Sequence, residues 1–146
     1  MSGARGEEID VDAVAANKAL VMRYFDIVGG RLDAPLADCF AADARWHVPP
    51  SNPMIRPNPK CGIDGVMEVL GSGVAVYAPG SIDISLEAVI ADRHDVATQF
   101  TLCARLADGR PYENRYFFRF RIAGGRIAEV WEYFDTLLQQ QLGALA

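Results

Sequence analysis

Four long runs of alternating apolar and polar residues fill the second half of the chain and constrain its fold more than any other feature. The runs cover residues 82–91, 96–106, 112–122 and a stretch that ends at Phe134. Alternation with a period of two is typical of strands that bury one face, and the short Asp- and Gly-containing segments between the runs are typical of hairpin turns. The pattern therefore predicts an antiparallel sheet built from consecutive hairpins.

The first half of the chain shows helical spacing instead. Apolar residues recur every three or four positions over residues 12–28 and 62–77, with Asp12 as a suitable cap and Gly29 as a suitable end of the first helix. The other expected elements are a short helix from Asp33 to Phe40, a strand over residues 45–48 and a final helix over residues 136–142. Helices followed by hairpins predict an α+β fold, a cone-shaped roll in which a curved antiparallel sheet wraps around the N-terminal helices.

The composition fits one globular domain, since 51% of the 146 residues are hydrophobic. We expect this domain to span residues 12–146 after a flexible leader over residues 1–11. A net charge of −5 offers no basic surface for nucleic acid, and no apolar run is long enough to cross a membrane. Three scattered cysteines and the lack of a signal-peptide pattern favour a cytoplasmic protein. We expect no metal and no cofactor, because no metal-ligand spacing and no phosphate-binding glycine motif is present.

Several polar side chains fall on strand faces that should be buried. In the strand over residues 112–122 the arginines share one face, so Asn114 and Tyr116 on the other face should point inward. Glu132 lies in one row with Val130 and Phe134. We assign Gln99, Thr101 and Cys103 of the strand over residues 96–106 to the same interior. An apolar interior with a few convergent polar groups predicts a pocket for a small ligand.

Glu132 is the strongest candidate for chemistry. Burying an ionised carboxylate without partners costs several kcal/mol, so this side chain is paired, protonated or exposed to a cavity. An apolar pocket raises a carboxyl pKa toward neutrality, which suits a general acid or base. The alternative is a structural glutamate that Gln99, Asn114 or a water molecule holds in place.

Segments along most of the chain resemble one superfamily. They are Arg23-Tyr24-Phe25, Gly30-Arg-Leu-Asp33, Phe40-Ala-Ala-Asp-Ala-Arg-Trp46, Asp108-Gly-Arg-Pro-Tyr-Glu-Asn114 and Gly125-Arg-Ile-Ala-Glu-Val-Trp-Glu-Tyr-Phe-Asp135. By their order and spacing the chain resembles the nuclear transport factor 2-like, or SnoaL-like, superfamily over about residues 14–142. The resemblance implies a cone-shaped roll with a deep pocket and often a homodimer. This fold hosts isomerases, cyclases, hydrolases, dehydratases and binding proteins.

Two branches of the superfamily give comparisons at the level of residues. Similarity to steroid delta-isomerases implies that Tyr24 and Tyr116 stand at the oxyanion-binding positions, whereas Val48 stands where the general base would be. Similarity to limonene epoxide hydrolases places the catalytic set at Thr101, Gln99 and Glu132. Only Glu132 is acidic, so the resemblance does not carry either complete catalytic set to this chain.

Two of the remaining candidates, His47 and Asp135, each have two interpretations. His47 either shuttles protons at the pocket mouth or faces outward, as simple alternation predicts. Asp135 either acts as a late acid or caps the last helix. Trp46, Val48, Phe118 and Phe134 are expected to form apolar walls, with Cys103 beside them. The proline-rich segment 49–60, which holds five of the eight prolines, is expected to be a loop that limits access.

These expectations predict a cofactor-independent enzyme that transfers a proton in a hydrophobic cyclic or aromatic molecule, as an isomerase, cyclase, dehydratase or lyase. Glu132 would move the proton, while Tyr24, Tyr116 and Asn114 would hold the developing oxyanion or a hydroxyl. Three alternatives stay open: a non-catalytic binding protein, an epoxide hydrolase-like enzyme with an altered triad, and an interaction module. The outer sheet face, where Phe117, Trp131 and Tyr133 interrupt the charges, suits a homodimer interface.

Overall fold

The computed structural model describes residues 10–143, and a six-stranded sheet with three α-helices accounts for most of this part of the chain. The elements are α1 (Val11–Val28), the 3₁₀ turn η1 (Leu36–Cys39), β1 (Phe40–His47), β2 (Lys60–Cys61), α2 (Ile63–Ala75), β3 (Asp83–Ala91), β4 (Asp95–Arg105), β5 (Pro111–Ala123), β6 (Arg126–Phe134) and α3 (Thr136–Gln141). Residues 1–9 of the expected leader lie outside the described residues. None of the described helices is long and apolar enough to cross a membrane.

The strand order is β2-β1-β6-β5-β4-β3, and the four strands predicted from the alternating runs form the antiparallel part from β3 to β6. These hairpins are antiparallel as expected, while β1, whose partner the sequence does not predict, runs parallel to β6, so the whole sheet is mixed. Parallel neighbours need a long connection between them. Here residues 48–125 lie between the two strands, so no hairpin turn fixes their relative direction.

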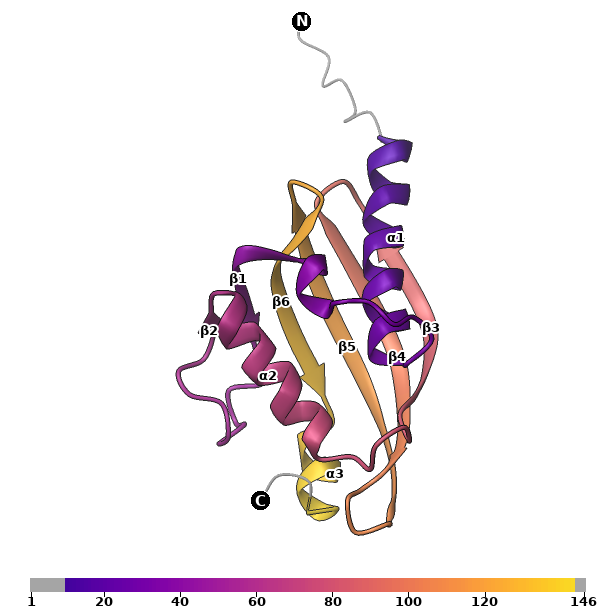
Figure 1. Ribbon diagram of the computed structural model, residues 1–146, viewed down its shortest axis with the longest axis vertical. Helices are drawn as coiled ribbons and strands as arrows, with labels where there is room; N and C mark the ends of the chain where they lie inside the picture. The colour runs from indigo at the N-terminus through magenta and orange to yellow at the C-terminus, as the bar shows by residue number, and fades with distance from the viewer. Residues whose placement is uncertain (1–9, 144–146) are drawn as a thin grey trace, which may run out of the picture.

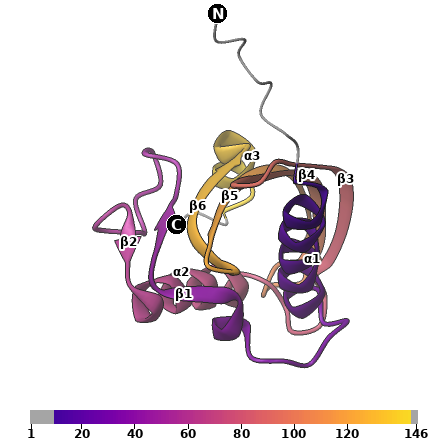
Figure 2. The same cartoon turned by 90° about the horizontal axis from the view of Figure 1, so that it is seen from above.

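The sheet curves and encloses a space that two helices cover. Figures 1 and 2 show α1 inside the curve formed by β3 and β4, while α2 lies across the molecule beside β1. The α1 residues Val21, Tyr24 and Phe25 recur at helical spacing and are buried against the sheet. The Phe25 and Phe100 rings lie 4.9 Å apart between centroids, in an edge-to-face arrangement that aromatic pairs favour. The observed architecture is the expected α+β roll.

The ends of the first two helical segments differ from the predictions. The N-cap of α1 is Asp10, whose side chain accepts a hydrogen bond from the Ala13 amide at 3.0 Å, so Asp12 lies within the first turn. The helix expected from Asp33 to Phe40 is a single 3₁₀ turn that follows Pro35. Proline has a fixed φ and no amide hydrogen, which disfavours a regular helix through this position.

Candidate active site

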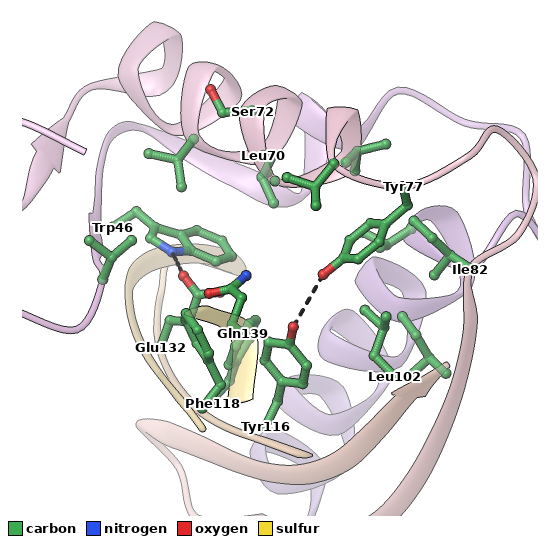
Figure 3. A pocket seen from close by; sticks show the side chains of 18 of the residues that line it. Trp46, Leu70, Ser72, Tyr77, Ile82, Leu102, Tyr116, Phe118, Glu132 and Gln139 are labelled. Carbon is green, nitrogen blue, oxygen red and sulfur yellow. Dashed lines mark hydrogen bonds between the residues drawn. The ribbon is translucent and has the colours of Figure 1, made fainter. Parts of the chain in front are cut away.

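A pocket lies between the two helices and the curved sheet, in the place where the sequence predicts one. Its volume is about 130 Å³, and apolar side chains form most of its wall. The polar groups on the wall come from separate elements, and Figure 3 labels Trp46, Ser72, Tyr77, Tyr116, Glu132 and Gln139 among them. The polar residues of the wall are Tyr24, Trp46, Asn52, Ser72, Tyr77, Tyr116, Glu132 and Gln139.

Glu132 reaches the pocket because it occupies the inward row of β6. It pairs across the sheet with Phe118 of β5, while its neighbour Val130 is fully buried in the same row. The Trp46 Nε1 group donates a hydrogen bond to Glu132 Oε2 at 3.1 Å. Burial raises the pKa of Glu132 from 4.5 to about 7, although the Trp46 hydrogen bond to the ionised form acts in the opposite direction. The carboxyl group is therefore divided between its two protonation states near neutral pH.

Tyr24 places a phenol from α1 on the pocket wall. The residue is only 3% exposed, and among residues 10–143 no hydrogen-bond partner of its hydroxyl is found. Burial and the nearby Glu132 carboxylate both raise the Tyr24 pKa well above its usual value. The phenol therefore stays protonated and can donate its hydrogen to a ligand.

Two further tyrosines of the wall, Tyr77 and Tyr116, form a chain of hydrogen bonds with the buried Tyr112, which does not line the pocket. The Tyr116 hydroxyl lies 2.7 Å from the Tyr112 hydroxyl and 3.2 Å from the Tyr77 hydroxyl. Asn114 Nδ2 donates to the Tyr112 hydroxyl at 3.0 Å and to the Asp135 carbonyl at 2.9 Å. Because Nδ2 can only donate, Tyr112 accepts there and has its own proton available for Tyr116. The chain thus leaves one hydroxyl proton, on Tyr116 or Tyr77, for the pocket.

The structure brings most of the predicted pocket residues together. The following predicted residues line the same pocket: Tyr24, Trp46, Val48, Tyr116, Phe118, Glu132 and Phe134. Asn114 is buried as expected, yet it does not line the pocket, because its amide is committed to Tyr112, Asp135 and the Arg115 amide hydrogen. Asn114 can therefore influence a ligand only through the tyrosine chain.

The assignment of Gln99, Thr101 and Cys103 to the interior is wrong. They pair with the outward-facing residues Phe117, Arg115 and Glu113 of β5, whereas their neighbours Phe100 and Leu102 pair with Tyr116 and Asn114. Residues directly opposite each other in an antiparallel pair share one face of the sheet. Outside, the Thr101 hydroxyl bonds to Glu87 and the Cys103 thiol lies 3.5 Å from Glu113.

His47 and Asp135 take the second of their two interpretations. His47 lies 3.0 Å from Glu129 and stacks on Trp131 with ring centroids 5.0 Å apart. It borders a second cavity, which shares Val48 and Glu132 with the main pocket. Asp135 is the N-cap of α3 and accepts a hydrogen bond from the Leu138 amide at 2.9 Å. Neither side chain lines the main pocket.

Tyr77 and Gln139 are pocket residues that the sequence did not reveal. Tyr77 follows α2 and Gln139 lies in α3, and both were expected only as members of helical segments. A weak signal existed for Gln139, which follows two leucines in a short helix and could have been read as part of the buried stripe. Gln139 is 8% exposed, and its Oε1 is the buried side-chain polar atom for which residues 10–143 offer no hydrogen-bond partner.

A metal centre is not evident in this part of the chain, because the described residues contain no group of three or more His, Cys, Asp or Glu side chains that could hold an ion. The polar groups of the pocket are one carboxyl, several phenols, an indole, amides and the hydroxyl of Ser72. Such a set can exchange a proton and can hold a neutral or anionic oxygen by donated hydrogen bonds.

Comparison with known proteins gives a consistent family and fold. The sequence profile of the SnoaL-like domain matches residues 21–130. No curated protein matches the chain significantly.

Among solved structures, a candidate SnoaL-like polyketide cyclase from Jannaschia sp. CCS1 is 17% identical, with a TM-score of 0.73 and coverage of 98% of this chain and 97% of that one. Bal32a from a soil-derived mobile gene cassette is 18% identical, with a TM-score of 0.75 and coverage of 92% and 99%. TerC co-crystallised with polyporic acid is 16% identical, with a TM-score of 0.74 and coverage of 87% and 97%. At these identities the structural likeness establishes the fold alone.

Proposed function

The chain belongs to the SnoaL-like domain family, and on this premise we propose that it is a cofactor-independent enzyme that transfers a proton in a hydrophobic cyclic or aromatic small molecule. Isomerisation, cyclisation, dehydration and related lyase steps all need such a transfer. The observation that supports the proposal most directly is Glu132, a carboxyl group with a pKa of about 7 on the wall of an apolar pocket.

Glu132 has the properties that the proton transfer requires. A base works best when its pKa lies near the working pH, because it is then ionised in part and still takes up a proton readily. In the proposed step the ionised carboxylate takes a proton from a carbon beside a carbonyl group, and the electron pair moves onto the carbonyl oxygen. The protonated Glu132 then returns the proton to a different atom of the same molecule. Trp46 holds the carboxyl group in place between the two events.

The phenols supply hydrogen-bond donors for the oxygen on which charge develops. Tyr24 has a hydroxyl without a partner among the described residues, and the tyrosine chain offers one further proton from Tyr116 or Tyr77. Figure 3 shows the Trp46–Glu132 pair and the Tyr77–Tyr116 pair on different sides of the pocket. Donors fixed in an apolar site stabilise an oxyanion without reorganisation at the moment of reaction.

The proline-rich segment gives the pocket part of its rim. Asn52, Met54 and Ile55 from this segment line the pocket. Asn58 fastens the segment to the end of β1, since its Oδ1 accepts from the Val48 amide at 3.1 Å and its Nδ2 donates to the Val48 carbonyl at 2.9 Å. We propose that residues 49–60 limit access to the pocket and keep water away from the reacting group.

Proton exchange in a simple ketone tests the proposal without knowledge of the natural substrate. The probe is 2-tetralone in D₂O, and nuclear magnetic resonance follows the loss of its α-protons. We expect the protein to accelerate this exchange, with a rate that rises as pH passes through about 7 and Glu132 ionises. Glu132→Gln should lose about 100-fold or more of the acceleration, whereas the exposed Glu68→Gln should retain it. Equal exchange by wild type and Glu132→Gln would exclude Glu132 as the base.

A non-catalytic binding protein is the second candidate function. It is favoured by the pocket itself, which holds a single carboxyl group among the described residues, so any second acid would have to be a phenol. TerC was crystallised with polyporic acid, which supports a small organic ligand for this pocket without implying turnover. This candidate predicts binding of 2-tetralone with no acceleration of exchange, and unchanged affinity in Glu132→Gln.

We further propose a homodimer through the outer face of the sheet, in a reducing cytoplasmic setting where Cys39, Cys61 and Cys103 stay unpaired. Phe117 is 46% exposed and Tyr133 is 55% exposed on neighbouring strands. Such exposed aromatic side chains are enriched at interfaces. Sedimentation at micromolar concentration should show a dimer that the double substitution Phe117→Ser and Tyr133→Ser converts to a monomer.

A further inference from the structure

The amide of Gln139 is a polar group in the pocket wall that the proposed proton transfer does not use, and within residues 10–143 its Oε1 is the buried side-chain polar atom without a hydrogen-bond partner. Its side chain extends from α3 among the residues that line the pocket (Figure 3). The residue is 92% removed from solvent, since only 8% of its surface is exposed. Within the same residues its Nε2 atom has no hydrogen-bond partner either.

A buried amide atom without a hydrogen-bond partner lowers the free energy of unfolding. The Oε1 atom loses its hydrogen bonds to water, and the described residues around it return none. The packing of α3 shows that this position is held in place rather than left loose. Asp135 caps the helix, and Asn114 Nδ2 binds the Asp135 carbonyl at 2.9 Å, which fastens the start of α3 to β5. The fold therefore presents Gln139 to the pocket in a fixed position.

A ligand hydroxyl is the group that best matches this amide. A hydroxyl can donate to Oε1 and accept from Nε2, so it satisfies the amide in either orientation. The terminal torsion of a glutamine side chain is soft, so the amide can turn either atom toward the ligand. A methyl ether could only accept, and a hydrocarbon could do neither.

We propose that Gln139 is a specificity-determining residue that binds a hydroxyl group on the apolar ring system of the ligand. The inference rests on the proposed function only in that the pocket is the ligand site. It narrows the ligand class to hydroxylated cyclic or aromatic molecules. It also assigns α3 to the binding site, with Asp135 and Asn114 as residues that position it.

Binding of three matched probes tests the inference. They are 2-naphthol, 2-methoxynaphthalene and naphthalene, which differ only in the group that could meet the amide. We expect wild type to bind 2-naphthol more tightly than the other two, measured by titration of naphthyl fluorescence. Gln139→Met keeps the length of the side chain and removes the amide, so the preference for 2-naphthol over naphthalene should fall by about 3- to 10-fold. Gln140→Met is the matched control, because Gln140 is the exposed neighbour in the same helix.

The ligand-free protein gives a second, independent measurement. Removal of an amide that has no partner should raise the melting temperature of Gln139→Met by a few degrees, whereas Gln140→Met should leave it unchanged. Residues that bind a ligand at the expense of stability behave in this way. An amide with an unrecognised structural partner would give the opposite shift.

Each outcome decides the question. A preference for 2-naphthol that persists in Gln139→Met, or that disappears in Glu132→Gln instead, overturns the inference because the hydroxyl then binds elsewhere. A lower melting temperature for Gln139→Met, or failure of both Gln139→Met and Gln139→Leu to fold, also overturns it. Loss of 2-tetralone exchange in Glu132→Gln is a separate measurement, so failure of the proposed chemistry and failure of this inference are distinguishable.

Discussion

Glu132→Gln converts a titrating carboxyl group in the pocket into an amide of nearly the same shape. Trp46 Nε1 donates to Glu132 Oε2 at 3.1 Å, and the glutamine oxygen can accept the same hydrogen bond. The substitution therefore preserves the neighbouring contacts and removes only the ionisation. For this reason the difference in stability between wild type and variant reports on the environment of the carboxyl group.

The size and sign of the effect follow from the pKa. Glu132 titrates at 4.5 in an unfolded chain and at about 7 in the folded protein, because burial disfavours its charged form. Between these two values the folded state binds more protons than the unfolded state, so the stability that Glu132 contributes is fully present below pH 4.5 and decreases as pH rises through 7. This difference between the two pKa values lowers the free energy of unfolding by roughly 3 kcal/mol between pH 4.5 and pH 8.

Chemical denaturation at a series of pH values measures this difference directly. We expect wild type and Glu132→Gln to have similar free energies of unfolding near pH 4.5, and the variant to be the more stable by up to about 3 kcal/mol at pH 8. Glu68→Gln, an exposed glutamate in α2, serves as the control and should follow wild type within about 0.5 kcal/mol. A constant difference between wild type and Glu132→Gln across this pH range would refute the argument that the pocket desolvates Glu132.

Three other substitutions test the support of the site. Trp46→Phe removes the donor that stabilises the ionised form of Glu132, so the pKa of Glu132 should rise further, and the pH profile of 2-tetralone exchange should move upward; a downward movement would contradict this role of the indole. Tyr112→Phe leaves an Asn114 N–H without a partner inside the core and should cost about 1–2 kcal/mol in denaturation experiments, whereas unchanged stability would contradict the tyrosine chain. Asp135→Ala removes the cap of α3 and should cost about 1 kcal/mol while weakening 2-naphthol binding, and an intact preference for 2-naphthol would show that α3 does not depend on its cap.

Local patterns in the sequence determined the elements and part of the site. Alternation located β3, β4, β5 and β6, because successive residues of a strand point to opposite faces whatever the rest of the chain does. The same alternation, together with the charged residues on the other face of each strand, placed Tyr116 and Glu132 on the pocket side. These features needed no knowledge of how distant segments meet.

Tertiary structure decided what depends on register and docking. The alternation of β4 divides its residues into two rows, but only its pairing with β5 shows that Phe100 lines the pocket and Thr101 does not. A slip of one residue would exchange the two rows. Tyr77, which follows α2, and Gln139 of α3 reach the pocket because these segments lie beside it in the folded chain. Their positions result from packing between segments far apart in the chain, which no short stretch of sequence encodes.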